Sequence, residues 1–140
     1  MSATVLYRIA AVLFILFAVG HTVGFLTFKP ASQEGLAVRD SMNSVKFQIG
    51  GRSFTYGDFY EGFGLYATAY LLFAAFLAWH LGGVARDFPQ AIGLLGWAFC
   101  ALQVVSVVLS WRYFLLPPVI LSGLSAICLG WAAWLVRIKT

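Results

Sequence analysis

Four long apolar stretches fill most of this chain, and each is long enough to cross a lipid bilayer. The first, Thr4–Phe28, has Arg8 as its charged residue and also contains His21. The other three contain no charged residue, and they are Gly62–Trp79, Phe88–Trp111 and Tyr113–Val136. A helix needs ~20 mainly apolar residues to cross the hydrocarbon core. Because backbone polar groups in lipid must be satisfied within the segment, the sequence predicts an all-α integral membrane four-helix bundle.

The composition leaves little room for a second domain. Hydrophobic residues make up 61% of the chain and charged residues 10%, whereas a soluble domain averages roughly a quarter charged. We therefore expect one transmembrane domain over residues 1–140, with spans at about 5–28, 58–80, 90–110 and 117–137. The first span is longer than a secretory signal core of ~7–15 residues, so we expect it to be retained.

The long connection at residues 29–57 contains its own structural signals. Helical spacing of apolar residues predicts a short surface helix near Glu34–Met42. Two alternating runs then flank Gly50-Gly51, which predicts a β-hairpin at Val45–Tyr56 with a primed two-residue turn. Farther along, Leu81-Gly82-Gly83 is expected to stop the second span. Pro89 is expected to open the third span, and Pro117-Pro118 the fourth.

Charge and cysteine content argue against several classes of function. The net charge of +4 comes from scattered residues, which argues against nucleic-acid binding and favours a mild attraction to lipid headgroups. Basic residues divide almost evenly between the two faces of the membrane, so the orientation rests on a weak preference for cytoplasmic termini in a bacterial inner membrane. Cys100 and Cys128 lack the spacing of a redox pair or a metal site and are expected to be apolar fillers, with a disulfide or a redox role as the alternative. His21 and His80 should lie ~25 Å apart along their spans, so we expect no haem, metal or other cofactor within one chain.

The candidate site residues lie toward one end of the spans. His21 and Glu61 are candidates for a general acid and base, because ionisable groups inside a membrane usually face the bundle interior and pair. Each has a structural alternative, since His21 could bond only a neighbouring helix and Glu61 could reach water. The candidate ligand-binding residues are Asp58, Tyr60, Gln103, Ser106, Arg112 and Ser122.

These ligand-binding candidates also have structural alternatives. For Asp58 we favour a cap at the start of the second span. Tyr60 fits an interfacial aromatic belt, and Arg112 fits a solvated turn. Gln103, Ser106 and Ser122 could serve only to join helices, as glutamine and serine often do in membranes. Gly20 and Gly24 form a G-x-x-x-G pattern around His21, which is expected to bring spans one and two together.

The motifs Gly20-His21-Thr22-Val23-Gly24 and Gly57–Gly64 give the chain a resemblance to a family of small uncharacterised bacterial membrane proteins. Members of that family have four predicted spans and a Gly-His-Thr-x-Gly signature in the first span. The resemblance covers nearly the whole chain and implies the four-span layout. It implies no activity, so no catalytic residue is carried over. The layout is also similar to that of DoxX-like proteins, but in architecture alone.

Two functions are expected from these observations. The first is a polar intramembrane pocket for a lipophilic small molecule of the sterol, quinone or isoprenoid class, with acid–base chemistry at His21 and Glu61. The alternative is a structural or accessory subunit, either a homo-oligomer or part of a larger membrane complex. A transporter is disfavoured, because no inverted repeat is visible and polarity stops halfway along the spans.

Overall fold

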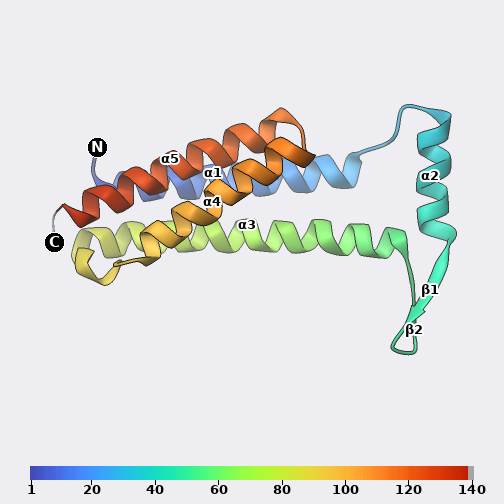
Figure 1. Ribbon diagram of the computed structural model, residues 1–140, viewed down its shortest axis with the longest axis horizontal. Coiled ribbons are helices and arrows are strands. Elements are labelled where there is room, and N and C mark those ends of the chain that lie inside the picture. Colours follow the sequence, from blue (N-terminus) through green and yellow to red (C-terminus); the bar gives the residue numbers. More distant parts are fainter. Residues whose placement is uncertain (139–140) are drawn as a thin grey trace. The chain divides into compact units, whose positions relative to one another are not determined.

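The computed structural model describes residues 1–138 and is mostly helical (Figure 1). The long helices are α1 (Ala3–Thr27), α3 (Tyr56–Asp87), α4 (Leu95–Tyr113) and α5 (Leu116–Arg137). Within residues 1–138, these four helices are long and apolar enough to cross a membrane. The protein is therefore a small polytopic membrane protein, and the predicted all-α membrane fold is confirmed.

The connection between α1 and α3 folds as predicted. It contains the short helix α2 (Gln33–Ser44) and the hairpin of β1 (Lys46–Ile49) and β2 (Arg52–Thr55). The strands pair antiparallel with Ile49 opposite Arg52, which leaves Gly50 and Gly51 as the turn. Their φ angles of 57° and 77° are the left-handed values that a type I′ turn requires at both central residues.

The chain divides into two compact units, which are described separately. The first unit comprises Met1–Phe17 and Leu71–Thr140, and the second comprises Ala18–Tyr70. The expectation of a single domain stays a prediction.

The first unit has an apolar core built from α1, α3, α4 and α5. Phe14 of α1 stacks on Phe99 of α4, with the ring centroids 5.5 Å apart. The helices α4 and α5 form an antiparallel hairpin, in which the Cys100 thiol approaches the Ala126 carbonyl oxygen at 3.5 Å. Both cysteines are free, and Pro117 and Pro118 lie in the first turn of α5 as predicted.

The second long helix does not stop at Leu81-Gly82-Gly83, so that prediction was wrong. Helix α3 continues to Asp87. A Cβ atom at Gly82 would lie 3.3 Å from the Thr4 carbonyl oxygen of α1, whereas the same atom at Gly83 would meet no described residue within 4 Å. Gly82 is therefore a packing residue that lets α3 approach α1 closely, not a helix stop.

The third long helix also begins later than predicted. Pro89 opens a short 3₁₀ turn, η1 (Pro89–Ala91), and α4 begins only at Leu95. Gly93 lies between the two elements with a φ of 47°. A left-handed residue cannot continue a right-handed helix, which separates the proline from α4.

Candidate functional site

The second unit contains a contact between the end of α1 and the start of α3. The His21 ring nitrogen Nε2 lies 3.0 Å from the carbonyl oxygen of Gly64. Since a carbonyl oxygen accepts hydrogen bonds, Nε2 must carry the proton and donate it. The imidazole also stacks on Phe25, with the ring centroids 5.3 Å apart.

Two threonines extend this contact by one turn. The Thr22 hydroxyl donates to the Ala18 carbonyl oxygen at 2.7 Å and lies 2.8 Å from the Thr68 hydroxyl. Thr68 in turn lies 3.2 Å from the Gly64 carbonyl oxygen. Short polar side chains of this kind join helices inside membranes. The polar groups of His21, Thr22 and Thr68 therefore hold α1 and α3 together in this unit.

The start of α3 is fixed by a reciprocal capping box. The Asp58 carboxylate accepts bonds from the Thr55 backbone N–H at 2.7 Å and from the Thr55 hydroxyl at 2.9 Å. The Asp58 backbone N–H donates to the Thr55 side-chain oxygen at 3.0 Å. This pattern satisfies free donors at the helix N-terminus. Asp58 thus has the capping role that the sequence offered as its alternative.

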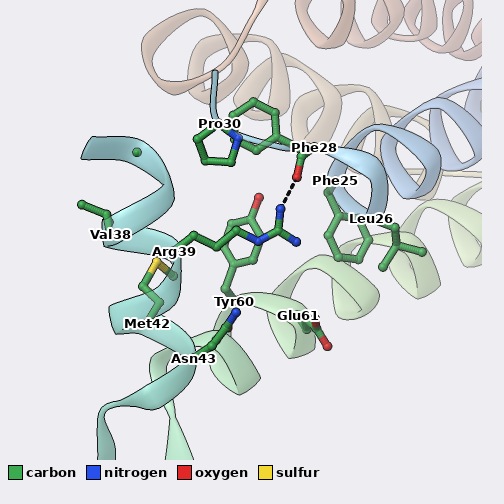
Figure 2. Close-up of a pocket in the computed structure, with 12 residues that line it drawn as sticks. Phe25, Leu26, Phe28, Pro30, Val38, Arg39, Met42, Asn43, Tyr60 and Glu61 are labelled. Atoms are coloured by element: carbon green, nitrogen blue, oxygen red, sulfur yellow. Dashed lines mark hydrogen bonds between the residues drawn. The ribbon is translucent and has the colours of Figure 1, made fainter. Parts of the chain in front are cut away.

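Helix α2 is tied to the end of α1 by one arginine. Arg39 is half-buried, and its Nη1 donates a hydrogen bond of 2.6 Å to the backbone carbonyl oxygen of Phe28. In Figure 2 the Arg39 side chain reaches from α2 toward the end of α1. Ser32 caps the N-terminal end of α2, where its side chain accepts a hydrogen bond from the Gly35 N–H at 3.0 Å.

A pocket of about 430 Å³ lies between α2 and the adjoining ends of α1 and α3 (Figure 2). Its apolar lining comes from Phe25, Leu26, Phe28, Pro30, Val38 and Met42. Its polar lining comes from Arg39, Asn43, Tyr60 and Glu61. The volume falls in the range of roughly 300–1,000 Å³ that is typical of small-molecule sites.

The pocket contains two opposite charges. Arg39 comes from α2 and Glu61 from the second turn of α3. In the described part of the chain, neither residue takes part in an ion pair. Apart from the bond to Phe28, the guanidinium makes no hydrogen bond to a described residue, so most of its N–H groups are available to a ligand.

The hairpin packs its aromatic residues on the start of α3. Phe47 of β1 lies 4.9 Å from Tyr56 and 5.4 Å from Phe59, measured between ring centroids. Phe54 of β2 contacts Phe59 at 5.8 Å. An isolated hairpin is only marginally stable in water. The aromatic cluster therefore stabilises this hairpin by packing it on the N-terminal turn of α3.

The predicted site residues fall in both units. The second unit contains His21, Asp58, Tyr60 and Glu61, and of these Tyr60 and Glu61 line the pocket. No hydrogen bond joins His21 to Glu61 within residues 1–138, because the imidazole bonds the Gly64 carbonyl oxygen one turn farther along α3. Their roles as acid and base stay a prediction.

The first unit contains the other four predicted ligand-binding residues. Gln103 and Ser122 are buried, with exposures of 1% and 0%. The Ser106 hydroxyl donates to the Leu102 carbonyl oxygen at 3.1 Å, within its own helix. Arg112 lies exposed in the last turn of α4. Their proposed contact with a ligand also stays a prediction.

Sequence reasoning missed Arg39, Asn43 and Met42 of α2, although it predicted the helix. The available signal was spacing, since Arg39 and Asn43 lie four residues apart and therefore on one face. The expected packing of Gly20 and Gly24 between α1 and α3 was wrong. A Cβ atom at either glycine would meet no described residue within 4 Å, whereas one at Gly64 would lie 2.6 Å from the Phe25 ring.

Within residues 1–138, no three histidine, cysteine, aspartate or glutamate side chains gather into a group that could hold a metal ion. Comparisons with protein-family models, with curated proteins and with solved structures found no match to this chain.

Proposed function

We propose that this membrane protein binds an amphipathic small molecule in the pocket of the second unit. The observation behind the proposal is that one cavity is lined by apolar side chains together with an arginine and a glutamate. A ligand with a polar head and an apolar body matches both kinds of lining. The pocket lies where α1 ends and α3 begins, which is the level of the membrane–water boundary if both helices span the bilayer.

The chemistry of the lining bears on the class of ligand. A sterol hydroxyl, a quinone or an isoprenoid chain would match the apolar wall but would leave Arg39 and Glu61 without charged partners. Since a charged group that loses water without a partner is destabilising, a more polar head suits the pocket better. Acid–base chemistry remains a further proposal, in which Glu61 contacts the ligand directly and His21 offers Nδ1.

The test is mass spectrometry of the molecules that co-purify with the protein. Replacing Met42, which lines the pocket, with Trp fills part of the cavity and should reduce retained ligand at least several-fold. The matched control is Leu36→Trp, on the same helix but outside the pocket lining. Equal retention by both variants and the native protein would contradict the proposal, provided that all three remain folded.

A second candidate is a homo-oligomeric or accessory role. The observation that favours it is the open face at Gly20 and Gly24, where small residues at this spacing could admit a helix from another chain. Gly20→Leu combined with Gly24→Leu should then abolish any oligomer seen by native mass spectrometry. An unchanged mass distribution would contradict this role.

The cellular setting is also part of the proposal. We place the protein in a bacterial inner membrane with cytoplasmic termini, and we relate it to the four-span family with the Gly-His-Thr-x-Gly signature. Cysteine accessibility at position 2 and at position 51, measured from each side of intact membranes, tests the orientation.

A further inference from the structure

We infer that the ligand head is a phosphate joined to a primary ammonium group, as in a phosphoethanolamine lipid. This inference rests on the proposed function, because it names the head group that the pocket would take. Two residues of opposite charge, Arg39 and Glu61, line one cavity without pairing to each other. A dipolar head group can satisfy both at once, whereas a ligand of single charge can satisfy only one.

Arg39 is suited to the phosphate. Its planar guanidinium offers several N–H donors and favours bidentate bonding to phosphate oxygens. One donor is fixed on the Phe28 carbonyl oxygen, and this bond holds the side chain across the pocket. The guanidinium is half-buried, so a phosphate bound there would be partly shielded from water.

Glu61 is suited to the ammonium. Its carboxylate can only accept hydrogen bonds when ionised, and a primary ammonium has three donors. The Asn43 amide in the same lining offers further hydrogen-bonding capacity. A quaternary ammonium has no N–H and would lose these bonds. An anionic head group without an ammonium could pair with Arg39 but would leave the Glu61 carboxylate without a partner.

The apolar lining indicates a lipid source for this head group. Phe25, Leu26 and Met42 surround the pocket with side chains that match acyl chains. A water-soluble glycerophosphoethanolamine has the same head group but no chains to bury. It should therefore bind much more weakly than the lipid.

The test uses delipidated protein and vesicles that contain phosphatidylethanolamine, phosphatidylcholine and phosphatidylglycerol in equal amounts with identical acyl chains. Retained lipid is measured by mass spectrometry. The native protein should retain phosphatidylethanolamine about three- to ten-fold over each competitor, allowing for solvent screening at the exposed carboxylate. In Glu61→Gln, the ratio of retained phosphatidylethanolamine to retained phosphatidylglycerol should fall close to one.

The main variant should remain folded, because Glu61 is exposed and makes no hydrogen bond or ion pair to described residues. Its control is Glu34→Gln, which removes the same charge from the second unit outside the pocket lining. Arg39→Gln should lower retention of all three phospholipids, and Arg52→Gln on the hairpin should not. A ratio that is unchanged in Glu61→Gln would overturn the inference.

Two further outcomes separate the inference from the proposed function. Suppose that the native protein retains the three lipids equally and that Met42→Trp retains none of them. This result would overturn the assignment of the head group and leave the proposed binding function intact. Retention that is unaffected by Met42→Trp would overturn both. If water-soluble glycerophosphoethanolamine displaced the bound lipid as effectively as phosphatidylethanolamine does, the ligand would not need acyl chains, which would contradict the lipid source.

Discussion

The guanidinium of Arg39 donates a hydrogen bond to the carbonyl oxygen of Phe28 at 2.6 Å. Phe28 directly follows the last residue of α1, where backbone carbonyls lack partners within the helix. A cation at a helix C-terminus is also favoured by the helix dipole. The Arg39 side chain therefore caps the C-terminal end of α1, links α2 to α1 and lines the pocket.

Arg39→Ala should loosen α2. A hydrogen bond to a charged group contributes about 1.5–3 kcal/mol when shielded, and partial exposure reduces this to about 1 kcal/mol. Amide hydrogen exchange in residues 33–44 should therefore become about five-fold faster. Arg52→Ala on β2 is the control and should leave exchange in α2 unchanged. Equal exchange in both variants would show that the bond to Phe28 does not hold α2.

Gly64 packs closely against the Phe25 side chain. A Cβ atom at Gly64 would lie 2.6 Å from the Phe25 ring, so Gly64→Ala should displace that ring from its contacts with His21 and Tyr60. We expect a loss of about 1–3 kcal/mol in the free energy of unfolding. Gly62→Ala is the control, because a Cβ atom there meets no described residue within 4 Å. That variant should be neutral or stabilise by up to about 1 kcal/mol through helix propensity.

The capping box should set where α3 begins. Thr55→Ala removes the hydroxyl that accepts from the Asp58 N–H at 3.0 Å. We expect a loss of about 1 kcal/mol, with faster amide exchange at residues 56–59. Ser53→Ala, on the same strand and without a cap bond, should show neither effect. An unchanged exchange rate in Thr55→Ala would mean that the aromatic cluster alone defines this helix start.

His21→Ala should weaken the α1–α3 contact only modestly. The imidazole bond to the Gly64 carbonyl oxygen is lost, yet Thr68 still lies within bonding distance of that oxygen. Side-chain hydrogen bonds between membrane helices average about 0.6 kcal/mol, and a loss of that size is expected. Unfolding in mixed micelles measures it. A loss of several kcal/mol would show that His21 supports more of the unit than this one bond.

Local sequence signals predicted much of the second unit. The alternating runs around Gly50-Gly51 specify a hairpin from residues that are neighbours in the chain, and the structure confirms its two-residue turn. The helical spacing after Pro30 likewise predicted α2. Asp58 was predicted as a cap because a carboxylate is favoured in the first turn of a helix, whereas its partner Thr55 is known only from the structure.

Features that depend on long-range packing were not predictable in the same way. The bond from Arg39 to Phe28 requires α2 to fold back on the end of α1, which periodicity does not show. The Gly82 stop failed for a similar reason, since a helix C-cap and a packing glycine look alike until the neighbouring helix is known. Gly20 and Gly24 lie on a face that is open in the described chain, whereas Gly64 meets Phe25.

The most direct test of ligand binding uses the methionine methyl groups. The chain has two methionines, Met1 and Met42, so a ¹³C-methyl-methionine NMR spectrum should contain one signal from each. Met42 lines the pocket and Met1 does not. Titrating phosphatidylethanolamine into delipidated protein should shift the Met42 signal to saturation and leave the Met1 signal in place. A Met42 signal that does not move, or that moves only in step with Met1, would contradict the claim that this pocket binds a lipid.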